Sequence, residues 1–146
     1  MSTSSGSSVS QPQQQTQEEK TIISEIQSRE AFFMLLEQNP GIIVIKLGAT
    51  WCGPCKRIER AVHDFFAGAP DNVICCDIDV DYSPDFYSFL KSKKMVNGIP
   101  ALLCYQKRNH TFVPNASITG TDSGKLHIFF TQCGQLRHQA MTELIP

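Results

Sequence analysis

Two cysteines, Cys52 and Cys55, stand two residues apart in the stretch ATWCGPCKR, with Gly53 and Pro54 between them. A thiolate is both a nucleophile and a metal ligand, and two thiols at this spacing can close a disulfide. The pair is therefore compatible with three kinds of site: a structural disulfide, half of a metal site, or a redox centre that cycles between dithiol and disulfide. The residues on either side distinguish between these three.

A metal site has little support in the rest of the sequence. A zinc ribbon needs a second C-x-x-C, whereas Cys75 and Cys76 are adjacent, and no histidine stands at ligand spacing from the first pair. Three alternating acidic residues lack the glycine and the closing glutamate of a calcium loop, so we expect a solvated strand end there. These residues are Asp77, Asp79 and Asp81. The sequence predicts no bound metal.

The cysteine pair lies at a junction between a strand and a helix. Before it, the segment IIVIKLGA at 42–49 is a nearly continuous apolar run, which is typical of a central strand covered on both faces. After it, apolar residues with helical spacing predict an amphipathic helix that ends near Gly68 and Pro70. The apolar positions are Ile58, Ala61, Val62, Phe65 and Phe66.

A helix N-terminus gives the two cysteines different roles. Its unpaired N–H groups and its macrodipole favour an anion, so we expect the thiolate of Cys52, just before the first turn, to be stabilised. Cys55 lies one turn further along, within disulfide reach, and Pro54 is tolerated where the first N–H groups have no intrahelical partner. We predict that Cys52 attacks an external disulfide and that Cys55 resolves the mixed disulfide.

From Thr21 onward, strand-like and helix-like segments alternate. The expected strands are 21–26, 42–49, 73–80, 99–105 and 112–119, the last an edge strand interrupted by Pro114. The expected helices are 29–38 with Ser28 as its N-cap, the helix after the cysteine motif, 84–94, and 123–139. This order predicts an α/β fold with a central mixed sheet and helices on both faces. The cysteine pair then lies at the carboxyl end of the central strand, where the reaction sites of open α/β sheets concentrate.

The segment WCGPCK after an apolar strand resembles the active site of the thioredoxin family, and the similarity extends over roughly residues 21–135. The resemblance implies a thioredoxin fold with a redox-active Cys52–Cys55 disulfide. It also implies that Trp51, Gly53 and Pro54 shape the active site.

A second segment, GIPALLCY at 98–105, is similar to the family's strand that begins with a cis-proline. The resemblance implies that Pro100 is cis and that the backbone of Ile99 pairs with the substrate as a short β-augmentation. Gly120 matches a glycine that keeps the substrate groove shallow in the family.

The resemblance implies a thiol–disulfide oxidoreductase that reduces disulfides on other proteins. Such an enzyme binds no cofactor and receives electrons from NADPH indirectly, through a flavoprotein disulfide reductase. Two alternatives remain open. The pair could be a more oxidising oxidant or isomerase, or the fold could serve as a binding or assembly module that holds a partner by β-augmentation.

Lys46 is the most consequential departure from the family pattern, because thioredoxins usually carry a buried Asp six residues before the first cysteine. A cation there would stabilise thiolate and make the pair more oxidising than an ordinary thioredoxin. A lysine that is neutral when buried could instead serve as a base. In a third interpretation Lys46 extends to the surface, toward Glu59, and has no catalytic part. We also expect the family's carboxylate–lysine pair to be missing or rebuilt with other groups.

Composition sets the outer limits. The chain has 146 residues, 41% of them hydrophobic, a net charge of −1 and a pI of about 6.4. These values predict one domain at 21–146, a monomer, and binding to neither nucleic acid nor membrane. Residues 1–20 are Ser/Gln-rich and predict a disordered tail without a secretory signal, so we expect a cytoplasmic protein. The remaining cysteines are expected to be buried thiols: Cys75, Cys76, Cys104 and Cys133.

Overall fold

The computed structural model describes residues 20–142, so the predicted tail, apart from Lys20, lies outside the described residues. The expected order of elements is confirmed. The strands are β1 (Ile22–Ile23), β2 (Ile42–Gly48), β3 (Val73–Asp79), β4 (Ala101–Gln106) and β5 (Ala116–Thr119). The helices are α1 (Arg29–Glu37), α2 (Gly53–Ala67), α3 (Pro84–Ser92) and α4 (Ser123–Thr142).

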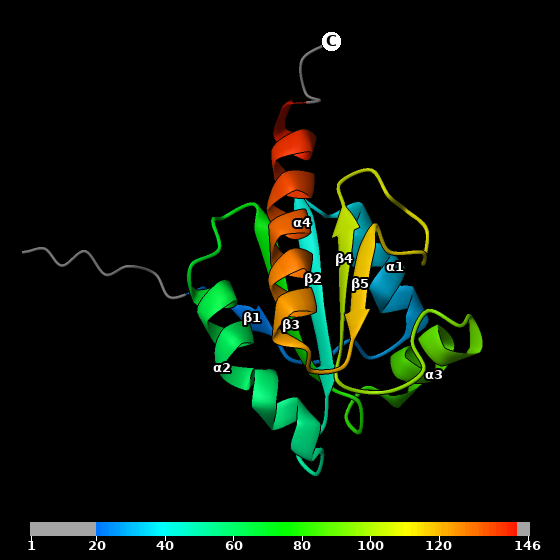
Figure 1. Cartoon of the computed structure of the whole chain (residues 1–146). Coiled ribbons are helices and arrows are strands. Elements are labelled where there is room, and N and C mark those ends of the chain that lie inside the picture. The colour runs from blue at the N-terminus through cyan, green and yellow to red at the C-terminus, as the bar shows by residue number, and fades with distance from the viewer. Residues whose placement is uncertain (1–19, 143–146) are drawn as a thin grey trace, which may run out of the picture.

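The strands form one mixed sheet in the order β1-β3-β2-β4-β5 (Figure 1). β1, β3 and β2 run parallel, β4 runs antiparallel to β2, and β5 runs antiparallel to β4. β2 lies in the middle, and all seven of its residues are buried. Its nearly continuous apolar sequence is explained by this position, because both of its faces are covered and both of its edges are paired.

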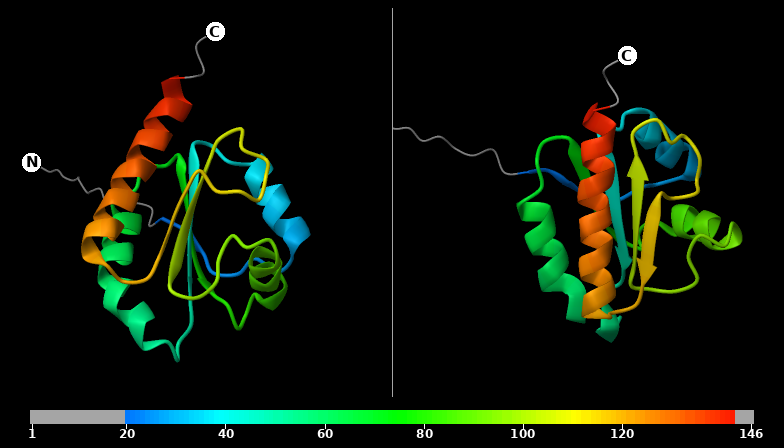
Figure 2. Two further views of the ribbon diagram at one scale, coloured as in Figure 1. Left: turned by 45° about the vertical axis from the view of Figure 1, so that its right-hand side comes forward. Right: turned by 45° about the horizontal axis from the view of Figure 1, so that its top comes forward.

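Helices cover both faces of the sheet: α1 and α3 lie on one face, and α2 and α4 lie on the other (Figure 2). Alternate residues of β2 enter the two cores, because successive side chains of a strand point to opposite faces. Ile43, Ile45 and Leu47 pack with α1 and α3. Ile42 and Val44 pack with α2 and α4. By the same alternation Lys46 points toward α2 and α4, although its side chain is polar.

Local signals place the starts of two helices. The Ser28 hydroxyl accepts a hydrogen bond from the Ala31 N–H at 3.0 Å, so the predicted N-cap of α1 is confirmed. Cys52 is itself the N-cap of α2, and Pro54 stands in the first turn. The helix then runs for 15 residues and buries Ile58, Val62 and Phe66 against the sheet, whereas Ala61, predicted on the same face, is exposed. The strand–cysteine–helix junction thus has the predicted form.

Two strands are shorter than the sequence suggests. The expected strand 21–26 pairs only at Ile22 and Ile23, and the expected strand 112–119 begins at Ala116. The loop before β5 is held by side chains instead: the Asn115 side-chain oxygen accepts from the Gln106 backbone N–H and from the Asn109 side chain. The Asn115 N–H still donates to the Cys104 carbonyl oxygen, but the Gln106 N–H donates to a side chain and Pro114 has no N–H to donate, so regular pairing starts at Ala116. No helix within residues 20–142 has the length and apolar character needed to cross a membrane.

Candidate active site

The two cysteines of the motif form a disulfide at the start of α2, with their Cα atoms 5.3 Å apart. Cys52 is 4% exposed and Cys55 is 3% exposed, so little of either residue is open to solvent. A Cβ atom added to Gly53 would meet no other atom within 4 Å. The chain between the two cysteines therefore presents an unobstructed surface, over which another polypeptide could approach.

The backbone of α2 favours negative charge on Cys52. The Cys55 N–H donates a hydrogen bond to the Cys52 Sγ at 3.2 Å, as an N-cap interaction. In the reduced protein, this donor and the positive end of the helix dipole stabilise a thiolate at Cys52. The geometry therefore suits Cys52 as the attacking sulfur and Cys55 as the sulfur that closes the disulfide.

Trp51 is the large exposed side chain beside the disulfide, and it is held in place from the neighbouring loop. Its side chain is 68% exposed, and its indole Nε1–H donates to Asp81 Oδ2 at 2.8 Å. The Asp81 backbone N–H in turn donates to Asp79 Oδ1 at 2.9 Å. From the sequence, Asp79 and Asp81 were expected only at a solvated strand end. The Trp51–Asp81 hydrogen bond was missed, because these two residues are 30 positions apart in the chain.

The end of the sheet next to the motif carries the other two positions that the resemblance singled out. The Ile99–Pro100 peptide bond is cis, as the resemblance implied. Ala101, the next residue, pairs with Leu47 at the end of β2. The Gly120 N–H donates to the Pro100 carbonyl oxygen at 3.0 Å, and the φ of Gly120 is +104°, a conformation that favours glycine. The contact of Ile99 and Gly120 with a substrate stays a prediction.

Lys46 lies beneath the disulfide and pairs with an aspartate on the adjacent strand. Its side chain is 10% exposed, and its Nζ lies 3.3 Å from Asp77 Oδ1. The two residues are direct neighbours in the parallel register of β2 and β3. Asp77 Oδ2 also lies 3.5 Å from His63 Nε2 on α2. The third interpretation directed Lys46 to the surface, toward Glu59; the structure instead pairs it with Asp77, because strand register brings that carboxylate alongside the lysine.

Because Gly48 has no side chain, the Lys46 side chain can lie close to Cys55. A Cβ atom on this glycine would lie 3.2 Å from the Lys46 Nζ and 3.3 Å from the Cys55 Sγ. The ammonium and the sulfur therefore cannot be more than about 6.5 Å apart, the sum of these two distances. Any larger residue at position 48 would crowd both groups. The expected carboxylate–lysine pair is thus rebuilt, with the lysine on β2 and the carboxylate on β3.

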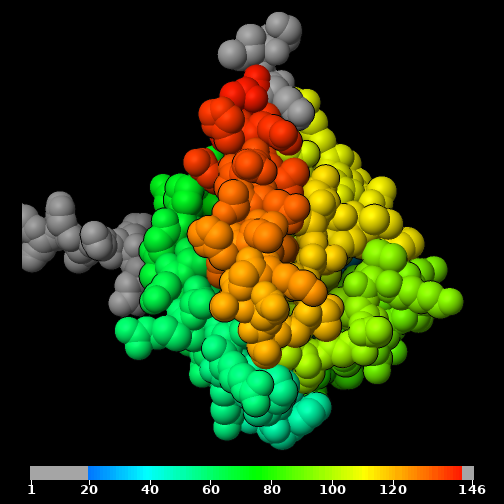
Figure 3. Space-filling view, in the orientation of Figure 1, coloured from blue at the N-terminus to red at the C-terminus, as the bar shows by residue number. Residues whose placement is uncertain are grey.

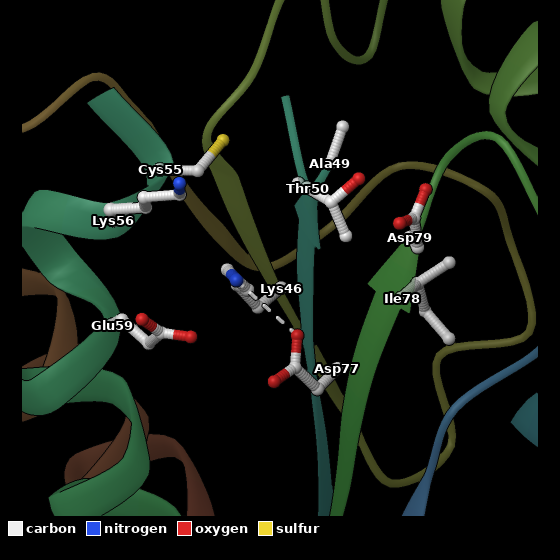
Figure 4. A pocket seen from close by; sticks show the side chains of 10 residues that line it. Lys46, Ala49, Thr50, Cys55, Lys56, Glu59, Asp77, Ile78 and Asp79 are labelled. Atoms are coloured by element: carbon white, nitrogen blue, oxygen red, sulfur yellow. Dashed lines mark ion pairs between the residues drawn. The ribbon is translucent and has the colours of Figure 1, made fainter. Parts of the chain in front are cut away.

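These groups line an open cavity of about 490 Å³ between α2 and the ends of β2 and β3 (Figure 4). Its polar lining consists of Lys46, Thr50, Lys56, Glu59, Asp77 and Asp79, and Cys55 lies at one side. Figure 4 shows the Lys46 and Asp77 side chains directed toward each other across the cavity floor. The opening gives water a route to the neighbourhood of Cys55, which is otherwise buried.

The other cysteines are built into the core rather than into a site. Cys75 and Cys76 enter opposite cores of the sheet, as adjacent strand residues must. Burial raises the pKa of Cys75 to about 11 and raises that of Cys76 further, so neither thiol competes as a nucleophile at neutral pH. A hydrogen bond with Cys104, and then burial, raises the pKa of Cys133. Within residues 20–142 no three His, Cys, Asp or Glu side chains are grouped to hold a metal ion.

Comparisons with known proteins agree with this geometry. The family model for thioredoxin matches residues 23–130. Thioredoxin of Mus musculus is 30% identical over 108 residues, which are 73% of this chain and 94% of the mouse protein. Thioredoxin of Homo sapiens is 35% identical over 75 residues, 51% of this chain and 70% of the human protein. The solved structure of mitochondrial thioredoxin 3 from Saccharomyces cerevisiae, in its oxidised form, superposes with a TM-score of 0.59 at 27% identity, covering 75% of this chain and 94% of that one.

Proposed function

We propose, because this chain belongs to the thioredoxin family, that it is a thiol–disulfide oxidoreductase that reduces disulfides of other proteins. The observation that carries the proposal is the Cys52–Cys55 disulfide at the N-terminus of α2, with the Cys55 N–H directed at the Cys52 sulfur. A purely structural disulfide has no need for a thiolate-stabilising donor on one sulfur.

The reaction is a two-electron exchange. In the reduced protein the Cys52 thiolate attacks one sulfur of a client disulfide, and the client's other sulfur leaves as a thiolate, which takes a proton from water. Cys55 then gives its proton to water, which reaches it through the cavity, and its thiolate attacks the Cys52 sulfur of the mixed disulfide. The second client sulfur leaves, Cys52 and Cys55 are oxidised to the disulfide, and the client is reduced by two electrons.

A protein client would lie across the end of the sheet beside the cysteine pair. The open surface over Gly53 admits a polypeptide, and the backbone of Ile99 offers hydrogen-bonding groups to an extended segment. Gly120, held to Pro100 by its N–H, presents no side chain to that segment. These features support the substrate-binding roles that the resemblance implies for Ile99, Pro100 and Gly120.

The oxidised protein must be reduced again for a second turnover. In this proposal the electrons come from NADPH through a flavoprotein disulfide reductase, and the chain itself binds no cofactor. We further propose that it acts in the cytoplasm, as a monomer, on proteins rather than on nucleic acid or membrane. The net charge of −1 supports the last point, because nucleic acid and anionic lipid favour basic proteins.

A Cys55→Ser variant tests the proposal. This variant retains the attacking thiolate but lacks the resolving thiol, so client proteins should accumulate as mixed disulfides that reducing agent releases. Cys52→Ser, which lacks the nucleophile, is the matched control and should capture none. Capture of a single partner that reducing agent does not release would contradict the reductase and support the binding module.

A second candidate is a more oxidising enzyme, an oxidant or an isomerase. The observation that favours it is the Lys46 ammonium within about 6.5 Å of the Cys55 sulfur, where the family usually has a carboxylate. A cation stabilises thiolate, and therefore the reduced form. The redox potential distinguishes the two candidates: about −270 mV is the value of a reductase, whereas about −200 mV or higher would favour the oxidant.

A further inference from the structure

A second hollow lies beside the strand that the client would pair with. Its volume is about 430 Å³, enough for a side chain with its neighbouring backbone. It opens between the C-terminal end of α3, the segment leading to β4, and the end of β5, which lie side by side at the surface (Figure 3). We call it the lysine pocket; it is lined by Lys91, Lys94, Met95, Val96, Asn97 and Thr119.

The lysine pocket is built of cations and neutral polar groups over an apolar floor. Lys91, Lys94, Asn97 and Thr119 are exposed at its rim, whereas Val96 is buried. Among the described residues, 20–142, no Asp or Glu lines it.

Neither rim lysine forms an ion pair within residues 20–142. The Lys91 Nζ lies 4.8 Å from the centre of the Tyr87 ring, and the intervening Lys93 is turned elsewhere, with its Nζ 5.5 Å from the centre of the Phe112 ring. A contact with an aromatic face does not neutralise an ammonium group, so the pocket offers two positive charges that no carboxylate of residues 20–142 pairs with.

The lysine pocket lies next to the backbone around Ile99, with which an extended client is expected to pair. Asn97 stands two residues before Ile99, so their Cα atoms are at most about 7 Å apart. Thr119 pairs with Ala101 and directly precedes Gly120, which is bonded to the Pro100 carbonyl. An extended client that pairs with Ile99 advances about 3.3 Å per residue, so a side chain two residues along it is displaced by about 7 Å, the same span as from Ile99 to Asn97.

We propose that the lysine pocket receives an aspartate or glutamate side chain of the client protein. The inference rests on the proposed reductase function and adds the substrate class: disulfides with an acidic residue two to four positions from the attacked cysteine. The two lysines attract the carboxylate, and the Asn97 amide and Thr119 hydroxyl can donate hydrogen bonds to it. Because the charges are exposed, the preference should weaken as salt screens them.

The test uses peptides that carry one cysteine in a disulfide with a small chromogenic thiol. Three peptides are identical except for Glu, Gln or Lys at the positions two to four residues from the cysteine. The reduced full-length protein is the only reductant, so that no recycling enzyme affects the rate. We expect the Glu peptide to react about threefold to tenfold faster than the Gln peptide, and the Lys peptide to be slowest.

Charge reversal at the pocket provides the matched comparison. Lys91→Glu, alone and with Lys94→Glu, should abolish or invert the order of the three peptide rates. The single variant is included because Lys94 has a φ of +62°, where substitution could disturb the turn. Lys107→Glu is the control of equal charge; Lys107 follows β4 at the opposite end of the sheet and should not alter the order.

The outcomes test the lysine pocket and the proposed reductase activity separately. Equal rates for the three peptides, or a Glu preference that survives charge reversal, would overturn the lysine pocket and leave the reductase intact. Failure to reduce any of the peptides, together with no captured client in Cys55→Ser, would contradict the reductase and with it this inference. A Glu preference that is lost in Lys91→Glu, and that falls at 1 M salt, supports it.

Discussion

Replacing the Lys46 ammonium by a neutral side chain of similar length should make the Cys52–Cys55 pair more reducing. In Lys46→Met the thiolate that forms at Cys55 loses a cation within about 6.5 Å. At that distance, with an effective dielectric constant of about 20, the attraction is about 2.5 kcal/mol. A thiolate exists only in the reduced form, so losing the attraction destabilises that form and lowers the potential by about 50 mV.

The Asp77 carboxylate should have the opposite effect on the redox potential, because it repels a thiolate at Cys55. Its removal therefore tests the direction of the predicted change. The carboxylate is 3.3 Å from the Lys46 Nζ, so it lies within about 10 Å of the Cys55 sulfur and repels a thiolate by about 1.7 kcal/mol. Asp77→Asn should therefore raise the potential, by less than Lys46→Met lowers it. The double variant should fall between the two, close to the wild type.

The effect of Lys46→Met on the redox potential should also depend on pH. A free cysteine loses its proton around pH 8.5, so the effect of a cation on thiolate is nearly complete at pH 9 and small at pH 6. We expect the difference between Lys46→Met and the wild type to fall from about 50 mV at pH 9 to less than about 10 mV at pH 6.

The assay follows the fluorescence of Trp51, the one tryptophan of the chain, in a dithiothreitol redox buffer. Lys107→Met is the control, since it removes the same charge at the far end of the sheet. Potentials for Lys46→Met and Asp77→Asn within about 10 mV of the wild type at pH 9 would refute the electrostatic reasoning. Lys46 would then have a structural role only.

Three other perturbations address the surroundings of the site. Asp81→Ala removes the acceptor of the Trp51 indole, so we expect lower fluorescence anisotropy of Trp51 and a several-fold higher KM for a protein client, with the redox potential unchanged. Ser28→Ala removes the N-cap of α1 and should lower the free energy of unfolding by about 1 kcal/mol in urea titrations, without loss of activity. Hydrogen bonds from Arg29 hold the pKa of Asp85 below its usual value, so the stability that Asp85 contributes is present at neutral pH and is lost as the pH falls through that lowered pKa. Asp85→Asn should therefore be less stable than the wild type at pH 7 and equal to it in strong acid, as measured by thermal unfolding.

The sequence by itself determined the features that depend on neighbouring residues. The apolar run of β2, the helical spacing after Cys55 and the capping by Ser28 are local patterns, and each has one favourable backbone solution. They were sufficient to place the cysteine pair at a strand–helix junction and to assign different roles to Cys52 and Cys55. The ends of several elements were misjudged, as before β5, where the Gln106 N–H donates to the Asn115 side chain and strand pairing begins only at Ala116.

Only the tertiary structure decided which distant groups act on those cysteines. The Lys46–Asp77 pair depends on the register between β2 and β3, and the Trp51–Asp81 bond depends on where the chain leaves β3. The lysine pocket likewise combines the end of α3 with a residue of β5. No periodicity in the chain encodes such contacts, because they arise from how crossover connections align separate strands. The sequence therefore located the cysteine pair, and the packing of the sheet determined the charges that surround it.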